Sequence, residues 1–340
     1  MATSEQGVAG RSTGAGILTA LQPGGYPERM TQMGQYPPAG HVLVHISDTH
    51  LLGEGRSLYG KVPVEERLAI AMARLEAGPV KPDALVFTGD LADLGEPDAY
   101  VRLRAIVEPV AARMGAELIW VMGNHDERAP YASLLFDEPE TDAPQDRVYD
   151  IRGLRVISLD TTVPGYHHGE LSAAQLEWLA GVLAQPAEHG TIVAVHHPPV
   201  PTPLEVMAVL ELLDQPALAE VLQGTDVRMI LGGHLHYSTH STFAGIPISV
   251  AAATCYTLDL GADASRLLSG VDGGQSFDFV HVYDDRVVTS TIPLDGFAEV
   301  TGFSSDYRPM IDAMPADVRL EQLSSKTSHL NLNEAAASDV

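Results

Sequence analysis

The segment His41-Val-Leu-Val-His-Ile-Ser-Asp-Thr-His50 passes directly from an apolar run into polar residues that can bind a metal ion. Its first six residues have the length and composition of a buried β-strand. Polar residues of the same kind also follow four further short apolar runs, at residues 84–87, 117–121, 191–195 and 227–231. Each of these runs is therefore predicted to be a strand that ends in a polar, functional loop.

Helical patterns separate several of the predicted strands. Helices are expected over about 63–78, over 97–114 and after Ser172, which opens a capping-box sequence. Segments 241–250 and 277–292 have the pattern of two β-hairpins. This order of elements predicts an α/β fold in which two sheets pack together with helices outside them.

Composition excludes several classes of protein. The 340 residues include 20 Lys and Arg against 45 Asp and Glu, which gives a net charge of −25. Such an acidic chain repels the phosphates of nucleic-acid polymers and anionic membranes, so we expect neither as a partner. Cys255 is the only cysteine, which rules out an intrachain disulfide. No apolar run approaches the roughly 20 residues that span a bilayer.

The chain is expected to have one large domain between two tails. Residues 1–40 are rich in Gly, Pro, Ser and Thr and are predicted to be a flexible N-terminal arm. The domain covers 41–296, and 297–340 form a C-terminal extension that is partly flexible. The N-terminus lacks the features of a signal peptide, so a cytoplasmic location is expected. Peripheral association of the extension with the cell envelope stays open.

The polar residues after the five strands are of the types that bind metal ions. Ligands of α/β sheets gather at the carboxyl ends of strands, so these clusters are expected to converge. Imidazole and carboxylate donors without thiolate suit Fe, Mn, Zn, Co or Ni. The clusters are Ser47-Asp-Thr-His50, Gly89-Asp90, Gly123-Asn-His-Asp126, His196-His-Pro-Pro199 and Gly232-Gly-His-Leu-His236.

The order of these motifs resembles that of the calcineurin-like metallophosphoesterase family. The stretches 45–50, 86–93, 120–126 and 233–239 are similar to those of its class III cyclic-nucleotide phosphodiesterases. The resemblance implies a four-layer αββα sandwich, a homodimer and a dinuclear centre of Fe(III)/Mn(II) or Mn(II)/Mn(II), with Zn or Co as alternatives. It also implies the ligands: Asp48, His50 and His236 for the first ion, Asn124, His196 and His234 for the second, and Asp90 as the bridge.

The same resemblance assigns residues to catalysis and substrate binding. His125 would face the leaving oxygen as general acid or leaving-group stabiliser, and Asp93 would be the carboxylate that pairs with it, with an ordinary loop carboxylate as the alternative for Asp93. Asn124 and His125 are expected to contact the substrate. His167 lies in the turn-rich segment 163–170 and is a further candidate for substrate contact, with a solvated loop as the alternative. His197 is expected to pack against the site or to support a ligand.

These assignments predict a phosphodiesterase that hydrolyses 3′,5′-cyclic AMP to 5′-AMP, and also 2′,3′-cyclic nucleotides, by in-line attack of a metal-bound hydroxide. The alternatives are a broader phosphodiesterase for glycerophosphodiesters or aryl phosphodiesters, and an inactive scaffold of the same fold. Leu94 and Asp126 stand where protein phosphatases of the superfamily carry Arg and Glu, which argues against that activity. Ala92 replaces the Tyr ligand of purple acid phosphatases.

Overall fold

The computed structural model describes residues 32–294 and 297–328. The chain divides into two compact units, one of residues 38–298 and one of residues 1–37 with 299–340. The flexible arm predicted for 1–40 lies mostly outside the described residues, as does the end of the extension after residue 328. Within the described part of the extension, two short helices form, α7 (Arg308–Ala313) and α8 (Ala316–Ser324).

The first sheet of the large unit has the order β13-β12-β1-β2-β3. Three parallel strands, β1 (His41–Ile46), β2 (Ala84–Thr88) and β3 (Glu117–Val121), form one part of it. The hairpin β12 (Ser276–Val282) and β13 (Val287–Pro293) adds to the edge of β1 in antiparallel orientation. The C-terminal hairpin therefore completes the sheet that the first strand begins.

The second sheet has the order β4-β5-β6-β7-β9-β8. Its four central strands run parallel to one another and its two edge strands run antiparallel. The strands are β4 (Arg147–Ile151), β5 (Leu154–Leu159), β6 (Thr191–Val195), β7 (Val227–Gly232), β8 (Thr239–Phe243) and β9 (Ile246–Val250). A small pair, β10 (Thr257–Leu258) with β11 (Gly270–Val271), follows outside both sheets.

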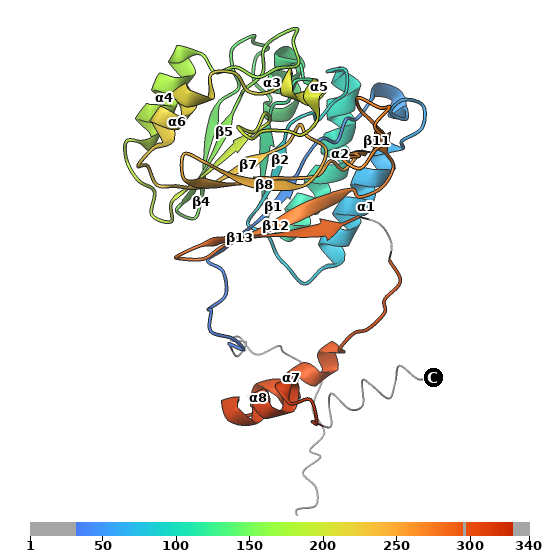
Figure 1. The fold of residues 1–340 in the computed structure, drawn as a ribbon, viewed down its shortest axis with the longest axis vertical. Coiled ribbons are helices and arrows are strands. Elements are labelled where there is room, and N and C mark those ends of the chain that lie inside the picture. Colours follow the sequence, from blue (N-terminus) through green and yellow to red (C-terminus); the bar gives the residue numbers. More distant parts are fainter. Residues whose placement is uncertain (1–31, 295–296, 329–340) are drawn as a thin grey trace, which may run out of the picture. The chain divides into compact units, whose positions relative to one another are not determined.

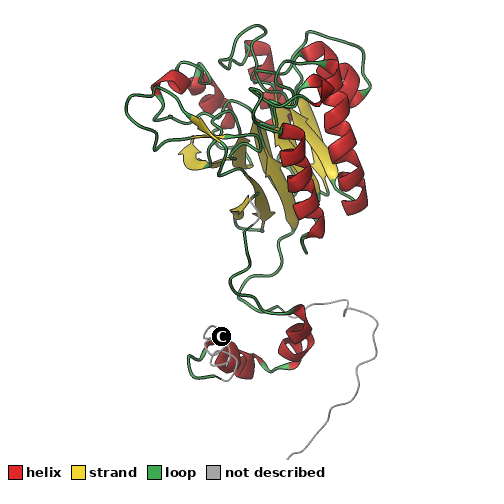
Figure 2. Ribbon diagram, turned by 90° about the vertical axis from the view of Figure 1, so that its right-hand side faces the viewer, coloured by secondary structure: helices red, strands yellow, loops and turns green. Residues whose placement is uncertain are grey.

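Helices cover the outer faces of the two sheets (Figures 1 and 2). The first sheet packs against α1 (Val64–Ala77), α2 (Pro97–Met114) and α3 (Arg128–Phe136). The second sheet packs against α4 (Ala173–Leu183) and α6 (Gln215–Leu222), and α5 (Glu205–Ala208) lies in a loop that contributes to the same core. The predicted four-layer sandwich of two mixed sheets between helices is confirmed.

A third core joins the two sheets face to face. Leu43 and Val86 of the first sheet lie in it with Ile192 and Leu231 of the second. Both faces of the central strands are therefore buried, which explains why their sequences are nearly continuous apolar runs. Because β1, β2 and β3 pack on β5, β6 and β7 in this way, the polar loops after the strands of both sheets meet.

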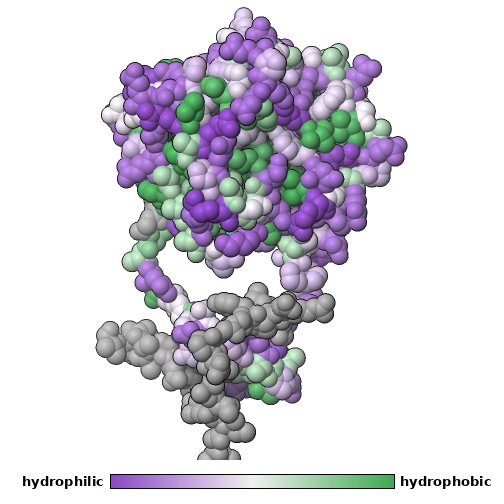
Figure 3. Space-filling model, turned by 180° about the vertical axis from the view of Figure 1, so that it is seen from behind, coloured by the Kyte–Doolittle hydropathy of each residue, from purple (hydrophilic) through white to green (hydrophobic). Residues whose placement is uncertain are grey.

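The surface differs from these cores. Hydrophilic residues predominate on the face seen in Figure 3, with apolar residues scattered among them. Across the described residues, no helix is both long enough and apolar enough to cross a membrane.

The core between the sheets should dominate stability. Leu231 is fully buried there, whereas Val101 in α2 is 52% exposed. Leu231→Ala is expected to lower the free energy of unfolding by about 2–5 kcal/mol because it removes buried apolar surface and leaves a cavity. Val101→Ala, as the control, should change it by less than about 0.5 kcal/mol. Urea titration of both variants tests this, and similar midpoints for the two would contradict it.

Candidate metal centre

Two sheets contribute to one cluster of polar side chains. Asp48, Asp90 and Asn124 follow the ends of β1, β2 and β3 in the first sheet. His196 follows β6 in the second sheet, and His234 and His236 follow β7. The structure brings these predicted residues together, and most of them are buried.

The first group of donors consists of Asp48, His50, Asp90 and His236, whose ligand atoms lie within 4.8 Å of one another. The Nε2 atom of His50 is 3.2 Å from Nε2 of His236 and 3.4 Å from Oδ2 of Asp90. Nε2 of His236 is 3.5 Å from Oδ1 of Asp48. A metal ion bound at about 2.0–2.2 Å to each donor separates neighbouring donors by roughly 3.0–3.5 Å, so this group fits one ion.

The second group shares Asp90 with the first. Nε2 of His196 is 3.3 Å from Oδ2 of Asp90 and 3.0 Å from Oδ1 of Asn124. His234 lies beside His196, with ring centroids 5.0 Å apart. The same carboxylate oxygen of Asp90 thus lies near donors of both groups, which is the arrangement that a bridging ligand requires.

Each of the four histidines in these groups has one ring nitrogen held by a residue outside the cluster. Such contacts fix the tautomer and the direction of the ring, and they leave the other nitrogen free toward the cluster. The held pairs are His50 Nδ1 with Asp93 Oδ1 (2.9 Å), His196 Nδ1 with Thr88 O (2.7 Å), His234 Nε2 with Leu210 O (3.0 Å) and His236 Nδ1 with Tyr256 O (3.1 Å).

The backbone of the cluster is strained. Five of the seven predicted ligand residues have positive φ, which few residues other than glycine adopt. The angles are 52° at Asp48, 46° at His50, 49° at Asp90, 70° at His234 and 56° at His236. This unfavourable conformation turns each chain sharply at the end of its strand and directs the side chain into the cluster.

Asp126 supports the strained loops without belonging to either group of donors. Its carboxylate accepts hydrogen bonds from the backbone nitrogens of Leu91 (3.1 Å), Ala92 (3.0 Å) and Gly123 (2.9 Å), and from the Tyr100 hydroxyl (2.9 Å). It therefore ties the loop after β2 to the loop after β3. The motif Gly123-Asn-His-Asp126 places Asp126 among residues that can bind a metal ion, but nothing in it shows which groups the side chain accepts from.

Gly123 is needed where these two loops touch. A Cβ atom at this position would clash with the backbone nitrogen of Asp90. The loop that carries Asn124 can therefore approach Asp90 only because residue 123 has no side chain.

Charges in the cluster are strongly coupled. Burial alone would raise the pKa of Asp90, but the nearby His196 and His125 rings outweigh it and hold the pKa well below its usual range. Burial likewise opposes protonation of His196, yet the negative charge of Asp90 raises the pKa of His196 to about 9. By contrast, burial lowers the pKa of His236 to about 4. Asp90 is therefore held in its anionic form, and its negative charge favours positive charge close to it.

His125 and Asp93 meet in a way that the sequence did not reveal. Nδ1 of His125 donates to the backbone carbonyl of Asp93 at 2.8 Å, while the nearest carboxylate oxygen is 3.6 Å away. The Asp93 carboxylate instead forms its short contact with His50. Asp93 therefore orients His125 through its carbonyl and His50 through its side chain.

His125 and His167 lie at the more open edge of the site. The His125 side chain is 29% exposed, and its ring centroid is 4.8 Å from that of His50 and 4.9 Å from that of His167. Nδ1 of His167 is 2.8 Å from the amide nitrogen of Asn124. His168 points elsewhere and contacts Glu170 at 3.1 Å.

Cys255 lies beside the first group of donors, within 4.8 Å of ligand atoms of His50 and His236, whereas His41 and His45 belong to neither group. His45 is buried in β1 and contacts Thr88 Oγ1 at 2.8 Å, as expected for a core residue. Cys255 is buried, and its Sγ atom contacts Nδ1 of His236, the nitrogen that is already held. His41 is the first residue of strand β1 and is 4% exposed.

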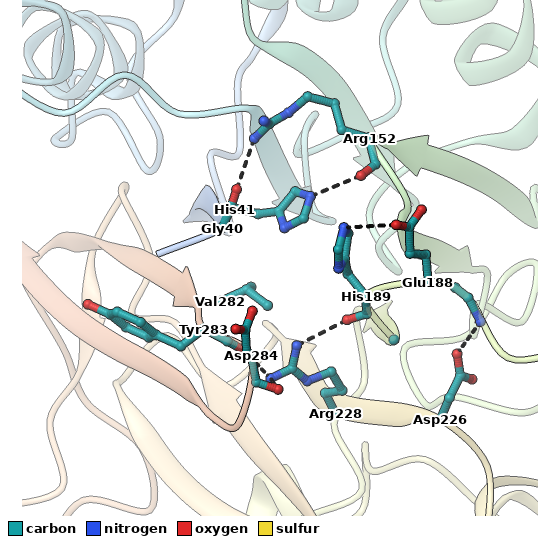
Figure 4. A pocket seen from close by; sticks show the side chains of 12 residues that line it. Gly40, His41, Arg152, Glu188, His189, Asp226, Arg228, Val282, Tyr283 and Asp284 are labelled. Atoms are coloured by element: carbon teal, nitrogen blue, oxygen red, sulfur yellow. Dashed lines mark hydrogen bonds and ion pairs between the residues drawn. The ribbon is translucent and has the colours of Figure 1, made fainter. Parts of the chain in front are cut away.

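A separate cavity of about 550 Å³ lies around His41 and His189 (Figure 4). Arg152 and Arg228 line it, and their guanidinium groups donate to backbone carbonyls of Gly40 and His189. His41 begins β1 whereas Asp48 follows its end, so roughly 20 Å of extended strand separates this cavity from the cluster. The cavity is therefore remote from the candidate metal centre.

Residues 41–238 match the family model described as calcineurin-like phosphoesterase. The chain belongs to the calcineurin-like phosphoesterase family. It is 57% identical over 271 residues to a cAMP/cGMP dual specificity phosphodiesterase from Mycobacterium tuberculosis, which covers 80% of this chain and 85% of that protein. It is 54% identical to a probable cyclic nucleotide phosphodiesterase from Rhodococcus erythropolis, over 78% of this chain and 88% of that protein.

A solved structure supports the fold. The dimetal phosphatase from Danio rerio superposes with a TM-score of 0.54 at 15% identity, covering 76% of this chain and 97% of that one. At this low identity the likeness concerns the fold alone.

The contact between Asp93 and His50 should control metal binding. Asp93→Ala removes the acceptor that orients His50 and is expected to weaken binding of one ion about 10- to 100-fold. Asp93→Asn keeps an acceptor oxygen for His50 and should therefore lose less metal affinity than Asp93→Ala. Calorimetric titration of each metal-free variant with Mn(II) measures its affinity for the ion. Unchanged affinity in Asp93→Ala would show that His50 is oriented without this carboxylate.

Proposed function

We propose that this protein is a dinuclear-metal phosphodiesterase that hydrolyses 3′,5′-cyclic AMP to 5′-AMP and also accepts 2′,3′-cyclic nucleotides. The observation that carries the proposal is the pair of donor groups that share Asp90, in a chain 57% identical to a protein named as a cAMP/cGMP phosphodiesterase. The two groups would bind two ions, as Fe(III)/Mn(II) or Mn(II)/Mn(II), with Zn or Co as alternatives.

The donor set supports this choice of metals. It consists of imidazole nitrogens with carboxylate and amide oxygens, which suit first-row ions of intermediate softness. Bound at this site, two such ions would supply an activated water and the positive charge that an anionic diester needs. Only Asp48 and Asp90 among the proposed ligands are anionic, so two ions with four or five positive charges leave the pocket positive in spite of the −25 charge of the chain.

Asn124, His125 and His167 would form the edge that receives the substrate. The amide nitrogen of Asn124 contacts His167, and the backbone nitrogen of His125 donates to the Asp90 carboxylate, so both residues lie beside the proposed ions. Because Nδ1 of His125 already donates to a carbonyl, a neutral His125 has no proton on Nε2. To protonate the leaving oxygen, His125 must therefore act as the imidazolium ion.

We also propose that the protein is a cytoplasmic homodimer. Apolar side chains that a partner could cover are exposed around β11, among them Leu267, Leu268 and Val271. Light scattering after size exclusion tests the dimer. Cell fractionation tests the location, with peripheral binding of the C-terminal extension to the envelope as the contrary outcome.

A substrate panel tests the proposed activity. With Mn(II) supplied, the protein should hydrolyse 3′,5′- and 2′,3′-cyclic nucleotides in preference to glycerophosphodiesters and bis(p-nitrophenyl) phosphate. Asn124→Ala should lower kcat for cyclic AMP by about 100-fold or more, because it removes a ligand of one ion. Undiminished hydrolysis by this variant would refute a dinuclear mechanism. A preference for the other diesters would favour the broader phosphodiesterase, and no activity with bound metal would favour a scaffold.

The role of His125 can be separated from metal binding. His125→Ala is expected to lower kcat about 10²- to 10⁴-fold, because a general acid is lost. The metal content, measured by mass spectrometry, should stay at two ions per chain because no donor is removed. A parallel loss of metal and activity would instead make His125 a structural residue.

A further inference from the structure

His197 is fully buried beside the proposed ligands His196 and His234, with ring centroids 4.9 Å and 4.6 Å from theirs. Its Nδ1 atom is 2.8 Å from Oγ1 of Thr161, and its Nε2 atom is 3.1 Å from the backbone carbonyl of His167. A carbonyl can only accept, so Nε2 donates to His167 and Nδ1 accepts the proton of the Thr161 hydroxyl. Both ring nitrogens are therefore occupied, and His197 is not available as a ligand.

The ring of His197 is packed against the loop that carries His167. A Cβ atom at Gly169 would lie 2.7 Å from Cγ of His197, so the backbone runs directly over the imidazole. The base of this loop is closed by the backbone hydrogen bond from Glu170 to Thr161 (3.0 Å). The tip of the loop is held differently: His167 is exposed, and among the described residues its backbone carbonyl is hydrogen-bonded by His197 alone. His197 is thus the support beneath the tip.

His167 in turn contacts the proposed ligand Asn124. The amide nitrogen of Asn124 donates to Nδ1 of His167, and this places the amide oxygen 3.0 Å from Nε2 of His196, inside the cluster. Because an amide has one donor end and one acceptor end, the contact with His167 decides which end faces the metal site. It also leaves the second nitrogen of His167, Nε2, to carry the proton of the neutral ring.

We propose that His197 is a positioning residue that holds His167 against Asn124, and that the chain of contacts Thr161–His197–His167–Asn124 sets the substrate-receiving edge of the site. The inference rests on the proposed function, since it concerns how that same site receives a phosphodiester. His197 acts through His167 and touches neither the substrate nor a metal ion.

The loop has a second anchor that should preserve the fold when His197 is replaced. The guanidinium group of Arg128 donates to the carbonyl of Thr162 at 3.0 Å and to the Asp160 carboxylate at 3.1 Å. The start of the loop is therefore held independently of His197, and the effect of a substitution should be confined to the tip.

Two substitutions at position 197 separate the hydrogen bond from the packing. His197→Phe keeps the ring volume and removes both hydrogen bonds, and should lower kcat/KM for cyclic AMP about 10- to 100-fold. His197→Gln can place an amide nitrogen near the position of Nε2 and should recover most of the loss. Both variants should retain two bound metal ions per chain.

His41 offers a matched control at the opposite end of the sheets. It is also buried, and its Nε2 atom also donates to a backbone carbonyl, that of Arg152 at 3.3 Å. His41→Phe should leave kcat/KM unchanged. Thr161→Val removes only the hydroxyl that donates to His197 and should lower kcat/KM about fivefold, so that the proposal can be tested even if His197→Phe does not fold.

A double substitution tests whether His197 acts through His167. In a His167→Ala background, adding His197→Phe should lower kcat/KM by less than about twofold, because the residue to be positioned is gone. The inference would be overturned if the losses from His167→Ala and His197→Phe multiplied, or if His197→Phe lost bound metal. Wild-type kinetics in both His197→Phe and Thr161→Val would also overturn it. Failure of the proposed function looks different: the wild type would then not hydrolyse cyclic nucleotides, and the same comparison would be made on bis(p-nitrophenyl) phosphate.

Discussion

The Asp90 carboxylate is the interaction on which the site depends. Its Oδ2 atom lies 3.4 Å from Nε2 of His50 and 3.3 Å from Nε2 of His196, which come from different sheets. A shift of one sheet relative to the other by even 1 Å would remove one of these contacts. The tightly packed core between the sheets, with Leu43 and Leu231 fully buried, is what fixes that relation.

The strain of the ligand loops follows from the same requirement. An extended strand would point Asp48 and His50 to the same face but would set them roughly 6–7 Å apart along the chain. Positive φ at both residues breaks the extended backbone after β1 and lets both side chains enter one cluster, at a cost of about 1–2 kcal/mol for each. Contacts such as the hydrogen bonds from His234 N to the Asp48 carboxylate compensate for the strain.

Much of the fold could be predicted because the central strands are buried on both faces and end in polar motifs. The elements that were missed lack such signals. Strand β4 (Arg147–Ile151) is an edge strand in which only Ile151 is buried, so it lacks the continuous apolar run of the central strands. Helix α3 (Arg128–Phe136) is short, has Pro130 in its first turn and lacks a side-chain cap. In both cases tertiary contacts, which local sequence does not record, decide the structure.

The sequence predicted which residues would lie together, but not which of their atoms would be in contact. The motif places Asp93 near His125, yet one residue offers a carboxylate and a carbonyl, and only the structure shows that the carbonyl makes the short contact. The tight packing that brings Asp126 under three backbone nitrogens is equally invisible in the sequence, because backbone groups have no sequence signal.

The histidines show why proximity alone does not identify a metal ligand. His196, His197 and His234 lie within one group, and all three are buried. His196 and His234 each have one nitrogen held by a backbone carbonyl and one directed into the cluster, whereas both nitrogens of His197 are held. An imidazole binds a metal ion through a nitrogen that carries no proton, but Nε2 of His197 carries the proton that it donates to a carbonyl, and Nδ1 accepts the Thr161 hydroxyl. The hydrogen bonds around each ring, and not its position, therefore separate the proposed ligands from the residue that supports them.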